Sequence, residues 1–133
     1  MPDAPARVLE KTFLVSEADA IHFMGPEVTP ALSTPSMIRW MELTSRECAA
    51  GLLGPGEDTV GIALNIKHLA ATPEGMKVRV TATLEGVEGR VYSFRVEAFD
   101  ETEKIGEGTH QRARVAIAKF GSRVASKKTS TAG

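Results

Sequence analysis

Apolar and polar residues alternate with a period of two over much of the chain after Thr59. The pattern is clearest where Val78, Val80, Ala82 and Leu84 alternate with charged residues and threonines. Because successive side chains of a strand point to opposite faces, this alternation predicts strands with one buried face. Four strands are predicted here, at residues 60–68, 77–84, 92–98 and 104–120, with turn sequences at 72–75, 86–89 and 100–103.

One segment, Pro35–Ala50, has the features of a long helix. The Thr34 hydroxyl is placed to cap its N-terminus, Pro35 suits the first helical position, and Gly51 stops the helix. At 1.5 Å per residue the helix would be about 24 Å long. A first strand is predicted before it, at residues 7–15.

The order of one strand, one helix and four strands joined by hairpin turns favours an antiparallel sheet in a single α+β domain. This domain is expected to span residues 7–120, between a short leader at 1–6 and a polar C-terminal tail at 121–133. A five-stranded antiparallel sheet wrapped around one long central helix describes the hotdog fold, although other α+β sandwiches fit the same composition. Because a small sheet leaves an open edge, we expect a homodimer with a continuous sheet.

Charge and cysteine content argue against several classes of protein. The net charge of -1 gives no reason to expect nucleic acid or an anionic membrane as a partner. No stretch approaches the roughly 20 apolar residues of a membrane span, and the first residues lack a signal-peptide pattern, so the expected location is the cytoplasm. Cys48 is the only cysteine and the three histidines lack metal-ligand spacing. We therefore predict no disulfide, no metal site and no cofactor.

Three polar residues conflict with their local pattern and are the candidate functional residues: Thr34, Glu42 and His68. Glu42 shares a helix face with Ile38 and Ala49, where a solvated carboxylate is not expected. His68 ends a predicted apolar strand face. Each also has a plain structural explanation, namely a helix cap, a buried hydrogen-bonded carboxylate and a satisfied strand-end histidine. The residues alone leave both interpretations open.

Three blocks of sequence carry a resemblance to a known family. They are residues 34–42 with Ala49, Lys-His-Leu-Ala-Ala-Thr-Pro-Glu-Gly at 67–75, and Gly-Glu-Gly-Thr-His-Gln-Arg-Ala at 106–113. In this order they resemble the fluoroacetyl-CoA thioesterase-like family of hotdog-fold acyl-CoA thioesterases, over most of the chain. The resemblance implies that Thr34, Glu42 and His68 are catalytic.

The implied reaction is hydrolysis of a small acyl thioester of CoA or of another pantetheine carrier, without a metal or redox cofactor. In that reaction Glu42 would attack the carbonyl carbon or activate a water, and His68 would serve as acid and base. The Thr34 hydroxyl, with exposed N–H groups near the helix start, would hold the carbonyl oxygen. The sequence does not separate an acyl-enzyme from direct attack by water.

Three further residues are candidates for substrate binding. Arg112 would shape the acyl or pantetheine pocket, although a solvated strand face explains it equally well. Gly75 would let the thioester tail approach closely, and a turn explains it almost as well. Val28 lies in the loop before the helix, where the fluoroacetyl-specific enzyme has a phenylalanine lid. The stretch Gly25–Pro30 has no aromatic residue, so selectivity for the fluoroacetyl group is not predicted.

Two other functions are compatible with the sequence. One is a non-catalytic module that binds an acyl thioester or small ligand in the same pocket. The other is an enoyl-CoA hydratase, but its usual pair of aspartate and histidine on the helix side is not visible. The sequence identifies neither the acyl group nor the thiol that carries it, and it leaves dimer and tetramer open.

Overall fold

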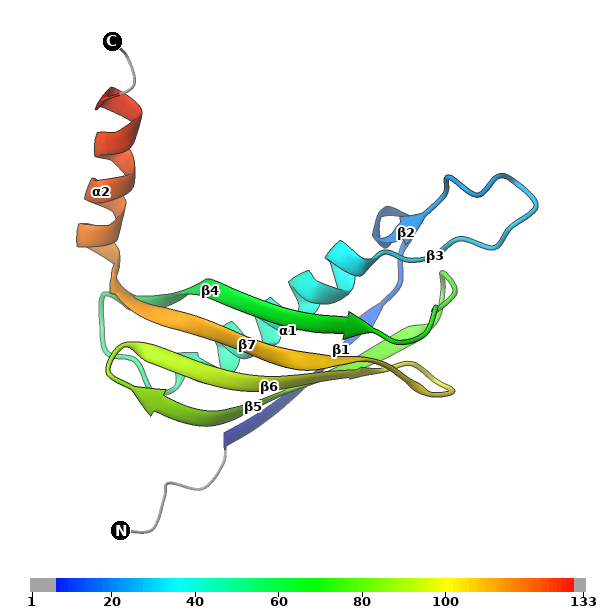
Figure 1. Cartoon of the computed structure of the whole chain (residues 1–133), viewed down its shortest axis with the longest axis horizontal. Coiled ribbons are helices and arrows are strands. Elements are labelled where there is room, and N and C mark those ends of the chain that lie inside the picture. Colours follow the sequence, from blue (N-terminus) through cyan, green and yellow to red (C-terminus); the bar gives the residue numbers. More distant parts are fainter. Residues whose placement is uncertain (1–6, 131–133) are drawn as a thin grey trace.

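The computed structural model describes residues 7–130, which form a curved sheet with one long helix across it (Figure 1). The predicted leader, residues 1–6, and the last three residues of the predicted tail lie outside the described part of the chain. In chain order the elements are β1 Arg7–Leu14, the short helix η1 Glu17–Asp19, β2 Ala20–Ile21, β3 Ala31–Leu32, α1 Thr34–Ala50, β4 Glu57–His68, β5 Lys77–Glu88, β6 Val91–Phe99, β7 Lys104–Ala116 and α2 Ile117–Ser130.

The five long strands lie in the order β1-β5-β6-β7-β4, and all neighbours are antiparallel. The predicted α+β architecture, five antiparallel strands around one long helix, is confirmed. One predicted connection is wrong: β4 pairs with β7, and no hairpin joins it to β5. Because β7 already bonds β6 on its other side, β4 becomes an edge strand. The chain then crosses the sheet to place β5 beside β1.

The start of α1 differs from the prediction by one residue. Ser33 is the N-cap, and its hydroxyl accepts a hydrogen bond of 3.2 Å from the Ser36 amide. Thr34 is the first helical residue and is not the cap. Both residues are hydroxyl-bearing, so either could satisfy the same orphan amide, and the capping prediction chose the wrong one. The Thr34 hydroxyl is thereby free for another partner.

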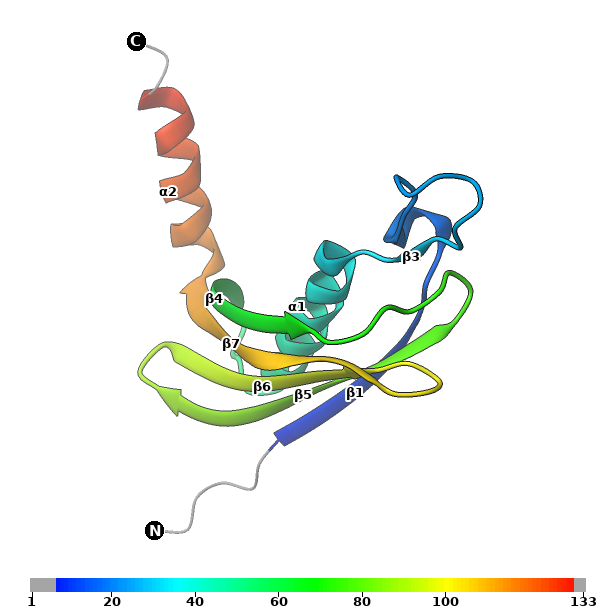
Figure 2. The same cartoon turned by 45° about the vertical axis from the view of Figure 1, so that its right-hand side comes forward.

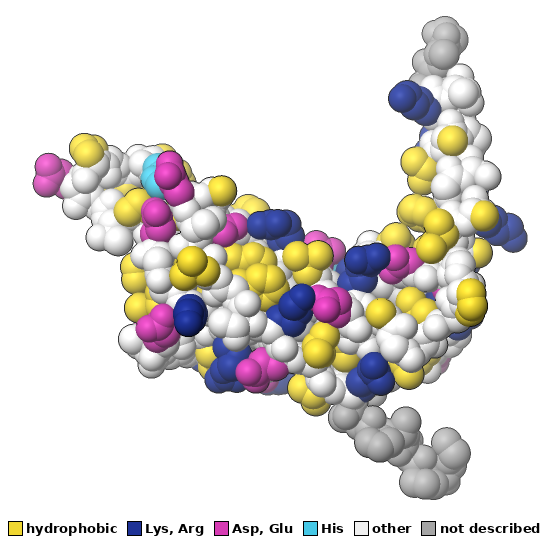
Figure 3. Space-filling model, turned by 180° about the vertical axis from the view of Figure 1, so that it is seen from behind, with side chains coloured by type: hydrophobic (Ala, Val, Ile, Leu, Met, Phe, Trp, Pro, Cys, Tyr) yellow, Lys and Arg dark blue, Asp and Glu magenta, His cyan; other side chains and the backbone are white. Residues whose placement is uncertain are grey.

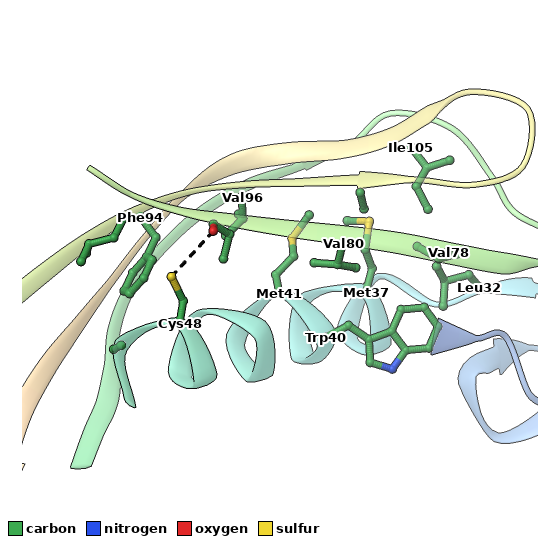
Figure 4. Packing of buried hydrophobic residues seen from close by; sticks show 14 of the residues in the cluster. Leu32, Met37, Trp40, Met41, Cys48, Val78, Val80, Phe94, Val96 and Ile105 are labelled. Atoms are coloured by element: carbon green, nitrogen blue, oxygen red, sulfur yellow. Dashed lines mark hydrogen bonds between the residues drawn. The ribbon is translucent and has the colours of Figure 1, made fainter. Parts of the chain in front are cut away.

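The buried face of α1 packs on the sheet and forms the hydrophobic core (Figure 4). Met37 and Met41 are completely buried and lie over β5 and β6, whose alternating apolar residues point toward the helix. Cys48 lies near the other end of α1, where its Sγ is 3.8 Å from the Ala82 carbonyl oxygen. Burial of large side chains on both sides is what fixes α1 against the sheet.

Strand β4 departs from simple alternation because it contains a β-bulge between Gly61 and Ala63. Gly61 pairs with Arg112, but Leu64 pairs with His110, so the bulge inserts one extra residue, Ile62. An extra residue exchanges the two faces, so Val60 and Leu64 cannot share the predicted apolar face. The side chains of Ile62 and Leu64 are 51% and 45% exposed.

The last strand ends at Ala116, so the predicted strand to Phe120 is too long. Helix α2 replaces its end and most of the predicted tail. From Ile117 the apolar residues recur at helical spacing, Ile117, Phe120 and Val124, which is the signal that the strand prediction overlooked. Helix α2 and the loop around β2 and β3 project from opposite ends of the sheet (Figure 2), with a hollow between them (Figure 3).

The packing of α1 generates a stability prediction. Met41→Ala should lower the free energy of unfolding by about 2–5 kcal/mol, because it leaves a cavity in a fully packed region. Leu52→Ala, at a side chain that is half exposed after the same helix, should change it by less than about 1 kcal/mol. Urea unfolding at one fixed protein concentration measures both. Equal losses of unfolding free energy in the two variants would show that the buried face of α1 contributes no more to stability than an exposed side chain does.

Candidate active site

Thr34 and His68 meet where the first residue of α1 comes beside the last residue of β4. The Thr34 Oγ1 lies 2.7 Å from the His68 Nδ1, which is a strong hydrogen bond. Because Ser33 caps the helix, the Thr34 hydroxyl has no competing role in the backbone. Two of the three predicted catalytic residues are therefore in direct contact.

The imidazole of His68 is held in its neutral form. Burial lowers the pKa of His68 below its ordinary value. Its Nε2 is buried and has no hydrogen-bond partner within residues 7–130. A buried N–H without a partner is more costly than a buried lone pair, so we place the proton on Nδ1, where it donates to Thr34 Oγ1. Nε2 then carries the free lone pair.

Glu42 lies elsewhere, in the middle of α1 and facing β4. Its Oε2 is 3.8 Å from the Arg112 Nη1, and its side chain is only partly buried. The backbone of β4 passes close to this carboxylate, since a Cβ built on Gly61 would lie 2.5 Å from the same oxygen. A side chain at position 61 would therefore push the Glu42 carboxylate away from its present position.

Arg112 belongs to a buried polar cluster and not to a solvated strand face. Its guanidinium donates to the Thr59 hydroxyl at 2.7 Å and to the Thr59 carbonyl oxygen at 2.8 Å, and its Nη1 lies 3.2 Å from the His110 Nε2. The His110 Nδ1 lies 2.9 Å from the Ala63 carbonyl oxygen, so it donates there and Nε2 accepts from Arg112. Burial lowers the pKa of His110, in agreement with a neutral ring.

The structure thus divides the predicted Thr34, Glu42 and His68 set into two groups within one chain. Thr34 and Glu42 are eight residues apart on the same helix, or about 12 Å along its axis. Glu42 contacts Arg112, while Thr34 contacts His68. No hydrogen bond or ion pair joins the two groups among the described residues.

A cleft of about 750 Å³ opens beside the first group. Thr34 and His68 line it together with Val28, one of the predicted substrate-binding residues. Phe23 and Met24 also line it, with the Phe23 side chain 80% exposed. The sequence interpretation missed these two, although a pair of large apolar residues next to the glycine of an irregular loop is itself a signal.

The other two substrate-binding candidates lie outside this cleft. Gly75 has a φ of +94° in the turn before β5, and a Cβ there would meet nothing within 4 Å. A turn that needs a positive φ explains this glycine without a ligand. Arg112 lies with Glu42, as described above.

No group of three or more His, Cys, Asp and Glu side chains within residues 7–130 is placed to hold a metal ion. None of the helices in this part of the chain combines the length and apolar character of a membrane span.

Comparison with known proteins identifies similar chains. Residues 15–118 match the family model described as fluoroacetyl-CoA-specific thioesterase. The chain is 44% identical over 102 residues to the fluoroacetyl-CoA thioesterase of Streptantibioticus cattleyicolor. The aligned residues make up 77% of this chain and 71% of that protein.

Solved structures give the same result for the fold. The structure of the fluoroacetyl-CoA thioesterase FlK superposes with a TM-score of 0.85 and 34% identity, covering 96% of this chain and 98% of that one. A hot-dog-like protein from Thermanaerovibrio acidaminovorans has a TM-score of 0.82 at 22% identity, covering 92% of each chain. The predicted hotdog fold is confirmed.

The environment of His68 generates a prediction about pH. Its pKa is lowered on folding, so the unfolded chain binds more protons below about pH 6.5. The free energy of unfolding should therefore fall as the pH drops through that value. An NMR titration should place the His68 midpoint below the value of a histidine in an unstructured peptide. A His68 midpoint above that of the peptide histidine would contradict a buried neutral imidazole.

The Arg112 cluster generates a second prediction. Arg112→Ala should lower the free energy of unfolding by about 2–4 kcal/mol, because Thr59 and His110 would be left buried without their donor. Arg114→Ala, two residues along the same strand, removes an exposed ion pair with Glu57 and should cost less than about 1 kcal/mol. Chemical denaturation of both variants measures the difference. Similar losses would mean that the buried hydrogen bonds contribute little.

Proposed function

Because the chain belongs to the fluoroacetyl-CoA-specific thioesterase family, we propose that it hydrolyses a small acyl-CoA thioester in the cleft beside Thr34 and His68. The observation that supports this site is the 2.7 Å hydrogen bond between the Thr34 hydroxyl and a neutral imidazole whose other nitrogen is unpartnered among the described residues. A base with a free lone pair beside a hydroxyl donor, at the wall of an apolar cleft, fits acyl transfer.

In the proposed reaction the oxygen of a water molecule bonds to the carbonyl carbon, and the bond from that carbon to sulfur breaks. His68 Nε2 or the Glu42 carboxylate accepts the proton of the water, and the thiolate leaves with a proton returned by the same acid. Alternatively, the Glu42 carboxylate bonds to the carbonyl carbon, the carbon–sulfur bond breaks and the thiolate leaves to be protonated by water, and the anhydride that remains is then hydrolysed by a second water. Both routes use the same residues, and they differ in whether an acyl-enzyme accumulates.

The Thr34 hydroxyl is the group that we assign to the carbonyl oxygen. His68 Nδ1 donates to Thr34 Oγ1, so the hydroxyl proton remains available for the substrate. Of the amides near the helix start, those of Ser36 and Met37 both bond Ser33, and Pro35 has no N–H. The oxyanion is therefore assigned to the side chain of Thr34 rather than to these amides.

We propose that the enzyme is a homodimer joined along β4. This edge strand has no charged residue from Thr59 to Ile66 and exposes the apolar Ile62 and Leu64. Unprotected apolar edges of this kind pair with another strand. The opposite edge, β1, carries charged residues that form ion pairs, such as Glu10 with Arg79, and is protected in the usual way.

A dimer joined along β4 would bring Glu42 of one chain close to the Thr34–His68 pair of the other chain. Glu42 lies beside Gly61 of its own chain. Gly61 is seven residues before His68 on β4, which is about 23 Å along the strand. Antiparallel pairing of two β4 strands about the middle of residues 61–65 would put the partner subunit's Gly61 beside Asn65, about 10 Å from His68. We therefore propose that each site uses Thr34 and His68 of one chain and Glu42 of the partner subunit.

The acyl group that we propose is small and not restricted to fluoroacetyl. Val28 borders the cleft in the loop before α1, and the stretch Gly25–Pro30 has no aromatic residue to close over a substrate. Phe23 is the aromatic residue that lines the cleft, and its side chain stands largely in solvent. An open cleft of this kind accepts more than one short acyl chain.

Release of free thiol from a panel of short acyl-CoA thioesters tests the function. Glu42→Gln and Thr34→Ala should each lower kcat by about 10²-fold or more, because each removes a positioned catalytic group, and Thr34→Ser should be milder. Glu47→Gln, on an exposed part of the same helix, is the control and should keep its activity. Thiol release at wild-type rate by Glu42→Gln would remove Glu42 from the mechanism.

Mixing two inactive variants tests the shared site. In a heterodimer of Thr34→Ala and Glu42→Gln chains, one site carries both changes and the other carries neither. After subunit exchange the mixture should regain about a quarter of the wild-type activity, since about half of the dimers are heterodimers with one intact site. A mixture that stays inactive while mass measurements show heterodimers would place all three residues in one chain.

A further inference from the structure

Helix α2 has a composition unlike the rest of the molecule. It contains four basic residues and no acidic one, and its Phe120 and Val124 side chains are 40% and 55% exposed. On the side seen in Figure 3, basic and hydrophobic side chains both stand in the open along this helix. A solvated helix normally mixes both signs of charge, so this one has the composition of a binding surface.

A groove of about 580 Å³ lies between α2 and the ends of β4 and β7. Its apolar lining includes Val60, Phe120 and Val124, and its basic lining includes Arg90, Lys119 and Arg123. Lys119 lies four residues before Arg123, and Phe120 lies four residues before Val124, so these two pairs form neighbouring rows along one side of the helix. No acidic side chain lines the groove.

Three basic side chains of the groove, Arg90, Lys119 and Arg123, have no acidic partner within residues 7–130. Other basic residues have acidic partners, for example Arg46 with Asp58 and Lys104 with Glu97. Apolar walls flanked by unpaired cations fit a flat aromatic ring that carries several phosphates.

We infer that this groove binds the nucleotide end of the substrate, the 3′-phosphorylated ADP of coenzyme A. The adenine would lie on Phe120 and Val124, and the phosphates would be held by Arg90, Lys119 and Arg123. This inference rests on the proposed function and on the β4 dimer. It selects CoA as the thiol carrier over a carrier protein, because a concave groove of nucleotide size suits a small ligand better than an acidic protein surface.

The proposed dimer explains how one substrate molecule can occupy both the groove beside α2 and the cleft beside His68. Within a single chain Val60 is eight residues from His68 along β4, about 26 Å. In the proposed antiparallel pair, Val60 would lie beside Ile66 of the partner subunit, only about 7 Å from the histidine of that subunit. The groove of one chain thus serves the cleft of the other, and the pantetheine arm crosses the interface between them.

Two matched substrates test the inference. The wild type, Arg123→Glu and Lys119→Glu are assayed with an acyl-CoA and with the pantetheine thioester of the same acyl group, which lacks the nucleotide. Each variant should raise KM for the acyl-CoA about tenfold or more through loss of a charge-assisted contact, with kcat retained. KM for the pantetheine thioester should change less than about twofold. The control Lys77→Glu makes the same charge change on β5, outside the groove, and should alter neither KM.

Binding measurements separate this inference from the proposed activity. Calorimetry with CoA and with 3′,5′-ADP should show binding to the wild type and about tenfold weaker binding to Arg123→Glu, whether or not thiol is released. A wild type that releases no thiol but binds both nucleotides would reject the activity and keep the groove. Equal KM changes for both thioesters, loss of the dimer, or a KM change only toward an acyl carrier protein would overturn the nucleotide assignment.

Discussion

The position of α1 on the sheet determines the rest of the structure. Met37, Met41 and Cys48 are buried along one face of this helix and pack on β5 and β6, which fixes both its height above the sheet and its rotation. With the helix in that position, its first residue reaches the end of β4 and its middle faces the start of the same strand. The Thr34–His68 pair and the contact of Glu42 with Arg112 both follow from this single packing arrangement.

The parts of the fold that the sequence predicted well are those where one local signal dominates. Val78 to Leu84 alternate without interruption, and β5 is a central strand whose inner face is fully buried. Strand β4 could not be derived in the same way, because a bulge at Ile62 exchanges its faces and its exposed side chains belong to an edge. Helix α2 was missed at Ile117, where the apolar spacing changes from two to three and four within a few residues.

The candidate site was predictable only in part, for a related reason. Thr34 and His68 were identified as residues, by pattern and by resemblance, and their contact required the order of the strands in the sheet. Arg112 illustrates the limit, since alternation along β7 permits a solvated face, and only the pairing of β7 with an edge strand covered by α1 makes it buried. Glu42 contacts Arg112 and not the Thr34–His68 pair, and no local sequence pattern reports this separation, because it depends on how the strands pair.

The location of the single cysteine has a consequence for an enzyme whose product is a thiol. Cys48 is almost fully buried on the core-facing side of α1, and burial raises the pKa of its thiol. A thiol kept protonated and out of solvent exchanges slowly with disulfides. Coenzyme A that is released and then oxidised therefore finds no accessible sulfur on the described surface with which to form a mixed disulfide, and turnover leaves the protein chemically unchanged.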